Sequence, residues 1–165
     1  MTLKNIIIFA VAIFLVSCHY KKGNFSVTSP SGWLTIDTVK ENHRKYVKMY
    51  APVRSSVPIF VENINIGIMR SSNINRFIKG VIAGIKEEAI YFEERGKGSI
   101  KVNKYDAKWE QYLVQIDKTS DLAEQRVYFI EDQRNIYQIV CSAKANEIQK
   151  LEPEIEEVLK SFRIL

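Results

Sequence analysis

The chain after residue 24 alternates apolar and polar residues over most of its length, which is the pattern of strands that bury one face. Turn-forming residues separate the alternating runs. The predicted strands cover residues 25–28, 33–36, 46–53, 60–69, 99–103, 108–117, 125–131 and 136–143. Residues 37–45 are polar and residues 94–98 contain two glycines, so we expect a loop and a turn there.

Two segments instead carry apolar residues three and four positions apart, and these are expected to be helices. Asn73 is suited to cap the first helix, because its short side chain can accept a backbone hydrogen bond. The apolar stripe of that helix consists of Ile74, Phe77, Ile78, Val81, Ile82 and Ile85. The second segment extends from Ile148 to Phe162, and we expect a break there, with Pro153 in the first turn of the final helix.

The first 18 residues differ from the rest of the chain and end in a cysteine. Lys4 precedes an uninterrupted apolar run, Ile6 to Val16, whose 11 residues are too few to span a bilayer. This combination is typical of a secretory signal, which is removed from the mature protein. The end of the signal, Leu-Val-Ser-Cys at residues 15–18, resembles the lipobox of bacterial lipoproteins.

That resemblance implies that residues 1–17 are a lipoprotein signal peptide and that Cys18 becomes a lipidated N-terminus. Residues 18–24 would then form a tether, and residues 25–165 the folded domain. Two or three acyl chains would anchor the protein durably, since each buried methylene contributes about 0.8 kcal/mol. The alternative is an ordinary secretory signal that happens to end near Cys18.

The residue after Cys18 bears on the destination of the protein. It is His19, whereas an aspartate at this position marks inner-membrane retention in many Gram-negative bacteria. We therefore expect a lipid-anchored protein of the bacterial cell envelope, attached to the outer membrane.

Composition limits the chemistry that the mature domain can perform. The 165 residues are 46% hydrophobic and 26% charged, which suits one globular domain with a leader. The formal net charge of +5 comes from scattered basic residues, so nucleic acid is not an expected partner. Once Cys18 is acylated, Cys141 is the one remaining thiol. It lies in an alternating apolar run and is expected to be a buried structural residue.

Histidines are equally few. His19 and His43 lie in no metal-ligand spacing, and the sequence contains no glycine-rich phosphate loop. We therefore expect neither an enzyme nor a bound metal or cofactor. Hydrolysis that depends on His43 stays as an alternative, which His43→Ala would test.

Basic and aromatic residues interleave between residues 97 and 109, and this stretch is the candidate binding surface. Its members are Lys97, Lys101, Lys104, Tyr105 and Lys108, with Trp109 next in the chain. Such a surface suits anionic lipid or an acidic partner. The alternative is that the lysines lie on the solvent-facing sides of strands while Trp109 belongs to the core.

Short motifs stand at both ends of the domain. Residues 25–33 read Phe-Ser-Val-Thr-Ser-Pro-Ser-Gly-Trp, and residues 137–143 precede an acidic helix that ends at residues 159–163 with Leu-Lys-Ser-Phe-Arg. Together these motifs resemble the PsbP-like family, which includes DcrB-type lipoproteins and Mog-type Ran-binding proteins. The resemblance implies an α+β fold, in which helices pack on the faces of an antiparallel β-sheet. Residues 105–107 depart from the family pattern, because relatives often have a glycine before the alanine.

Two functions are compatible with these features. The first is a non-enzymatic, lipid-anchored module that binds an envelope protein in an accessory role. It depends on the lipobox, the lack of catalytic residues and the binding habits of the resembled family. The alternative is a lipoprotein that binds a small ligand, a lipid or an ion, in a cavity between helix and sheet, where Gly80 and Gly84 would permit close approach.

Overall fold

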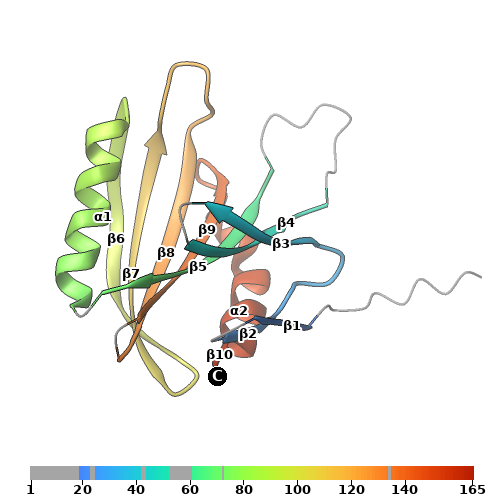
Figure 1. Ribbon diagram of the computed structural model, residues 1–165. Coiled ribbons are helices and arrows are strands. Elements are labelled where there is room, and N and C mark those ends of the chain that lie inside the picture. The colour runs from blue at the N-terminus through green and yellow to red at the C-terminus, as the bar shows by residue number, and fades with distance from the viewer. Residues whose placement is uncertain (1–18, 23–24, 42–43, 53–60, 72, 134) are drawn as a thin grey trace, which may run out of the picture.

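The computed structural model describes residues 19–22, 25–41, 44–52, 61–71, 73–133 and 135–165 (Figure 1). The main sheet of these residues is antiparallel and has seven strands in the order β3-β4-β5-β9-β8-β7-β6. Its strands are β3 (Leu34–Glu41), β4 (Arg44–Tyr50), β5 (Asn63–Arg70), β6 (Tyr91–Val102), β7 (Tyr105–Gln115), β8 (Ala123–Asp132) and β9 (Asn135–Lys144). A smaller sheet has the order β1-β2-β10 and consists of β1 (His19–Lys22), β2 (Phe25–Thr28) and β10 (Arg163–Ile164).

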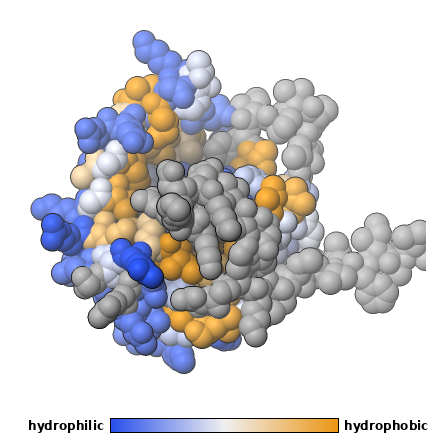
Figure 2. Space-filling view, in the orientation of Figure 1, coloured by the Kyte–Doolittle hydropathy of each residue, from blue (hydrophilic) through white to orange (hydrophobic). Residues whose placement is uncertain are grey.

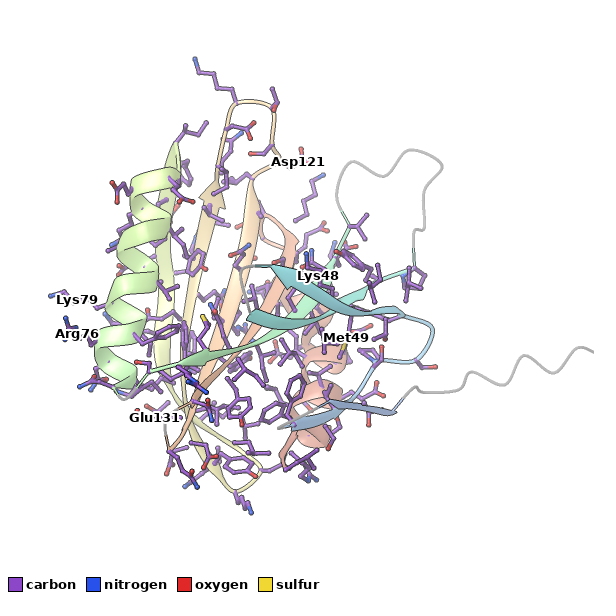
Figure 3. All side chains as sticks on the ribbon, viewed as in Figure 1. Lys48, Met49, Arg76, Lys79, Asp121 and Glu131 are labelled. Carbon is purple, nitrogen blue, oxygen red and sulfur yellow. The ribbon has the colours of Figure 1, made fainter. Side chains whose placement is uncertain are left out.

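Helices cover the two faces of the main sheet. The helix α1 (Ile74–Glu88) lies on one face, and α2 (Glu152–Ser161) lies on the other, beside the small sheet (Figure 1). A short 3-10 helix, η1 (Ile148–Leu151), leads into α2. Strand alternation separates the faces, since Met49 is buried on the α2 side while the adjacent Lys48 extends to the other side of β4 (Figure 3). The fold class implied by the resemblance, α+β with helices on an antiparallel sheet, is confirmed.

Local sequence signals explain where both helices begin. The side chain of Asn73 accepts a hydrogen bond from the backbone N–H of Arg76 at 2.9 Å, as predicted for an N-cap. Pro153 lies in the first turn of α2, where its missing N–H removes no helical hydrogen bond. The predicted break before this helix is occupied by η1.

The core on the α2 side centres on three aromatic rings. Phe25 stacks on Phe162 with the ring centroids 5.8 Å apart, and Tyr137 meets both rings edge-on at 6.2 and 5.7 Å. Aliphatic residues of the sheet and of α2 surround them, and all three rings are at most 1% exposed. Side-chain hydrogen bonds add to the packing, because Asn103 donates to the backbone carbonyls of Leu159 and Phe162 at 3.0 and 2.6 Å.

The core on the α1 side is smaller. Its buried members are Ile78, Tyr112, Val114, Val127, Phe129 and Ile136. Ile78 is the one fully buried residue that α1 contributes, and the other apolar residues of the predicted stripe are only partly buried. Figure 2 shows apolar surface beside the hydrophilic outer side of this helix. The predicted apolar stripe therefore faces the sheet, but most of its side chains stay partly exposed to solvent.

The prediction of a loop at residues 37–45 is wrong. In the structure β3 continues to Glu41 and β4 begins at Arg44, and the two strands pair as an antiparallel hairpin with an irregularity between Asp37 and Val39. Backbone pairing across the hairpin extends the strands through polar residues. A residue-by-residue hydropathy pattern does not encode that pairing.

The prediction of a turn at residues 94–98 is also wrong. The strand β6 is continuous, and a bulge between Glu94 and Gly96 takes the place of the turn. The two glycines lie against the ring of Trp109 on β7. A Cβ atom on Gly98 would be 2.9 Å from Trp109 Nε1, and one on Gly96 would be 3.2 Å from the same ring. These glycines therefore make room for a bulky neighbour on the next strand.

Two short strands were not indicated by the pattern. Both pair with β2, so the small sheet joins the start of the described chain to its end. The strand β1 contains four of the residues expected to form the tether, and its first residue, His19, pairs with Thr28. Cys18 itself lies outside the described residues.

Candidate functional site

The candidate binding surface of the sequence lies on the β6–β7 hairpin, but strand alternation divides it between the two faces of the sheet. Lys97 and Lys108 reach the α1 side, and Lys101 lies in register with Asp106, with which it forms an ion pair at 2.6 Å. Tyr105 lies on the α2 side, packed against the core there. Lys104 lies over the Tyr105 ring at 5.4 Å from its centroid.

Tyr105 has a structural role. Its hydroxyl accepts a hydrogen bond from the backbone N–H of Ile164 at 3.2 Å and lies 3.4 Å from the carbonyl of the same residue. Trp109 also packs against the α2-side core, as its alternative interpretation predicted, and the Arg126 guanidinium lies 5.9 Å from its ring centroid. Trp109 also borders the groove that contains Lys97 and Lys108, whereas Tyr105 does not line it.

The two lysines that remain together line a groove between α1 and the β6–β7 hairpin, which we call the α1 groove. It has a volume of about 570 Å³ and is open to solvent. Its charged residues are Lys79 and Lys86 of α1, Glu94 and Lys97 of β6, and Lys108 and Glu110 of β7. Its apolar residues on the helix side are Ile78, Ile82 and Ala83.

The contribution of α1 to this groove was not predicted from the sequence, although the spacing of its residues indicates a shared edge of the helix. Asn75, Lys79 and Lys86 lie four and seven positions apart, which places them along one edge of a helix. Figure 3 shows Lys79 projecting from α1 away from the sheet. The prediction considered only neighbours along the hairpin and therefore missed these partners.

The charges of the α1 groove are unequally paired. Lys86 donates a hydrogen bond to Glu94 at 2.8 Å, and this contact holds the pKa of the Glu94 carboxyl below its ordinary value. Lys108 donates to the side-chain oxygen of Asn75. Within the described part of the chain, no carboxylate lies within ion-pair distance of Lys79, Lys97 or Lys108. These three ammonium groups are thus without a carboxylate partner among the described residues, although that of Lys108 donates to the neutral side chain of Asn75.

Glu110 is the second carboxylate of the α1 groove, and it is half-buried. Burial raises the pKa of its carboxyl, nearby Lys97 opposes that rise, and nearby Glu94 adds to it. Lys97 is the residue opposite Glu110 in the β6–β7 register. The carboxyl is therefore a half-buried group whose charge the neighbouring lysines help to stabilise.

Gly80 and Gly84 do not line a cavity as the alternative function expected. Both are exposed, and a Cβ atom added at either position would meet nothing within 4 Å. A different, mostly apolar groove of about 350 Å³ lies beside the C-terminal end of α1. It is lined by Ile85, Val114, Ile116, Ser120, Asp121, Ala123 and Gln125.

The polar cluster on the α2 side holds structural elements together. Arg126 donates to both carboxylate oxygens of Glu152 at 2.7 and 3.0 Å and to Gln111 at 2.9 Å. The buried Glu124 accepts from Gln111 at 2.7 Å and from the backbone N–H of Ile148 at 3.2 Å. These contacts fix η1 and the start of α2 on the sheet, so the cluster is explained by the fold.

Cys141 is fully buried, and burial raises the pKa of its thiol, so the sulfur stays protonated and unreactive. The prediction of a structural cysteine is confirmed. Across the described residues, no group of three histidine, cysteine, aspartate or glutamate side chains could hold a metal ion. No helix among them is long and apolar enough to cross a bilayer. Cys18 and His43 lie outside the described residues.

No protein-family model matches the sequence, and no curated protein matches it in sequence either. Solved structures do resemble it in fold. Cyanobacterial PsbP (CyanoP) of Synechocystis sp. PCC 6803 has a TM-score of 0.62 at 12% identity, covering 90% of this chain and 92% of that one. LpqN, which is involved in cell envelope biogenesis of Mycobacterium tuberculosis, has a TM-score of 0.62 at 14% identity, with coverages of 85% and 82%.

The Ran-binding protein Mog1p of Saccharomyces cerevisiae has a TM-score of 0.53 at 9% identity, covering 86% of this chain and 90% of that one. These likenesses extend over nearly the whole length of each protein. Identities this low show the fold alone. The described part of the chain has the PsbP-like α+β fold, as the motifs at its two ends implied.

Proposed function

We propose that this protein is a non-enzymatic, lipid-anchored accessory module of the bacterial cell envelope that binds a partner protein. The observation that carries the proposal is the α1 groove, an open concave surface with three lysines that form no ion pair within the described part of the chain, Lys79 of α1, Lys97 of β6 and Lys108 of β7. One wall of this groove is a helix that buries only Ile78. An open surface of this kind suits recognition, and neither histidine nor cysteine is among the described residues that line it. Among proteins of similar fold, Mog1p binds Ran and LpqN acts in envelope biogenesis.

The anchor is a separate part of the proposal and depends on Cys18. In the native host, full-length protein should fractionate with the outer membrane and incorporate labelled palmitate. Cys18→Ala should remove the label and release the protein from the membrane fraction. Palmitate incorporation that persists in Cys18→Ala would place the anchor elsewhere.

Partner binding is tested by crosslinking intact cells that express the full chain with a C-terminal tag, followed by affinity capture and mass spectrometry. A dominant envelope protein that disappears or changes place in Cys18→Ala supports an anchored binding module. Empty capture at normal expression contradicts it.

The second candidate is a small-ligand lipoprotein, and the apolar groove beside Ile85 favours it. Its volume of about 350 Å³ lies at the small end of ligand sites, which range over about 300–1,000 Å³. Gln125 and Asp121 would orient the polar end of a ligand at its rim. A fluorescent fatty acid should bind the full chain and lose affinity in Val114→Trp, which fills the groove. Unchanged binding in that variant would exclude the site.

A further inference from the structure

We propose that the α1 groove binds an acidic segment of the partner protein in extended conformation. This inference rests on the proposed function and adds to it the chemistry of the partner. We assign the binding site to the α1 groove and not to the whole β6–β7 hairpin for two reasons. Tyr105 lies on the opposite face of the sheet, and Asp106 neutralises Lys101.

Charge is the first argument. Four lysines and two glutamates line the groove, a net charge of +2. Lys86 and Glu94 neutralise each other at 2.8 Å, so the excess of +2 is that of Lys79, Lys97 and Lys108 less the charge of Glu110, which lies opposite Lys97 in the β6–β7 register. A carboxylate entering the groove would replace water around these ammonium groups with charge-assisted hydrogen bonds.

Shape is the second argument. Asn75 and Lys86, which mark the ends of the groove on α1, are 11 residues apart, or about 16 Å along a helix axis at 1.5 Å per residue. An extended chain of about five residues covers that length. Ile78, Ile82 and Ala83 provide an apolar wall between the cations, so apolar side chains of the segment would also find contacts.

The same features favour a protein segment over a membrane surface. The cations border a concave groove that also contains Glu94 and the half-buried Glu110. A flat anionic bilayer could not reach the apolar wall of a concave groove. A flexible segment can place its acidic residues beside the lysines and its apolar residues against the wall.

The test uses a photo-crosslinking amino acid, p-benzoylphenylalanine, in the full-length protein in its native host. Position 83 reports on the groove, because Ala83 is exposed and lines it. Position 149 is the control, because Gln149 is exposed on η1, on the α2 side of the sheet. We expect an adduct at position 83 that maps to a protein segment in which aspartate and glutamate outnumber lysine and arginine.

Charge reversal then tests the lysines. Lys79→Glu with Lys97→Glu and Lys108→Glu should lower the yield of the adduct at least tenfold, since like charges facing each other across an interface oppose association. The matched control reverses the exposed Lys118, Lys144 and Lys150, which are outside the groove, and should leave the yield unchanged. Lys108 is half-buried, so its replacement could disturb the fold. The double variant Lys79→Glu/Lys97→Glu changes only exposed positions and repeats the test with Lys108 intact.

Several results would overturn the inference: an adduct on phospholipid, a mapped segment that is neutral or basic, or an unchanged yield in both groove variants. Partner adducts at position 149 but not at 83 would refute the groove assignment while the proposed function stands. The absence of any partner adduct at either position, together with empty chemical crosslinking, would refute both.

Discussion

The two helices of this domain lie on the same sheet, yet the longer one is held by fewer buried residues. α2 has 10 residues and buries Ile155, Val158 and Leu159 in the larger core. α1 has 15 residues and buries Ile78 alone. Other contacts differ as well, because α2 is also fixed at its start by the Arg126–Glu152 ion pair and at its end by β10, which follows it and pairs with β2. The helix that supplies the candidate site is therefore the one on which the fold depends less.

This difference separates stability from recognition within one small domain. Elements with few buried apolar contacts open locally at lower free energy than the core does. A helix of that kind can adjust to a partner without endangering the sheet. Mutations on the two sides should accordingly differ in size and, at some positions, in sign.

The largest effect is expected on the α2 side. Phe162→Ala should lower the free energy of unfolding by about 3–5 kcal/mol, because it removes a ring packed between Phe25 and Tyr137. Urea denaturation measures the loss. Leu165→Ala is the control, since that side chain is 57% exposed and its removal should change stability by less than about 0.5 kcal/mol. Equal losses in the two variants would remove the contrast between the faces.

A smaller loss is expected on the α1 side. Ile78→Ala should cost about 2 kcal/mol, the low end for a buried isoleucine, because the open margin of α1 lets neighbours collapse into the space. Ile116→Ala is the control, because this side chain is exposed and its truncation should change stability less than that of Ile78. If Ile78→Ala were as damaging as Phe162→Ala, α1 would be an integral part of the stable core.

Stabilisation is expected on the outer side of α1. Gly84→Ala should raise the free energy of unfolding by about 1 kcal/mol, because alanine favours a helix and its Cβ would meet nothing within 4 Å. Gly98→Ala is the opposing control, since its Cβ would contact Trp109 at 2.9 Å and should destabilise the protein. Thermal denaturation of both variants compares the signs directly.

The smallest effect concerns pH. Burial raises the folded-state pKa of Glu110, so its stabilising contribution is present below the unfolded-state pKa and is lost as pH rises through the folded-state pKa. Glu110→Gln should remove this loss, with an effect below about 1 kcal/mol because solvent screens a half-exposed carboxyl. Denaturation curves across the acidic range provide the measurement.

Glu94→Gln is the matched control of opposite sign. The hydrogen bond from Lys86 lowers the pKa of Glu94, so its contribution is present above the unfolded-state pKa and is lost as pH falls through the folded-state pKa. The two variants should therefore change the pH dependence of stability in opposite directions. The same direction for both would mean that burial does not govern Glu110.

Much of the fold followed from local sequence signals. Asn73 and Pro153 marked the starts of helices, and the period-two runs marked most strands, because these patterns depend on neighbours within a few residues. The bulge between Glu94 and Gly96 and the room that Gly98 makes for Trp109 depend instead on a partner strand. A run of glycine and charge predicts a turn when read alone, and only the cross-strand neighbour reverses that interpretation.

The candidate site divided in the same way. Lys97 and Lys108 were found because they are close in sequence, and Tyr105 was wrongly grouped with them because alternation along β7 was not applied to the surface. Lys79 and Lys86 come from a helix that ends before the hairpin begins, so their position beside it is a tertiary fact. Helical spacing indicates their shared edge but not the strand that the edge meets.

The position of β1 has a consequence for how a lipidated form would stand on a bilayer. β1 begins at His19, one residue after the expected acylation site, and one residue reaches only about 3.5 Å. That reach is shorter than the layer of lipid headgroups, which is several ångströms thick on each side of the hydrocarbon. The domain would therefore rest on the membrane without a spacer, with the β1 side down. Because β1 lies beside α2 while α1 lies on the far face of the main sheet (Figure 1), the α1 groove would point away from the lipid, toward proteins that approach from the aqueous compartment.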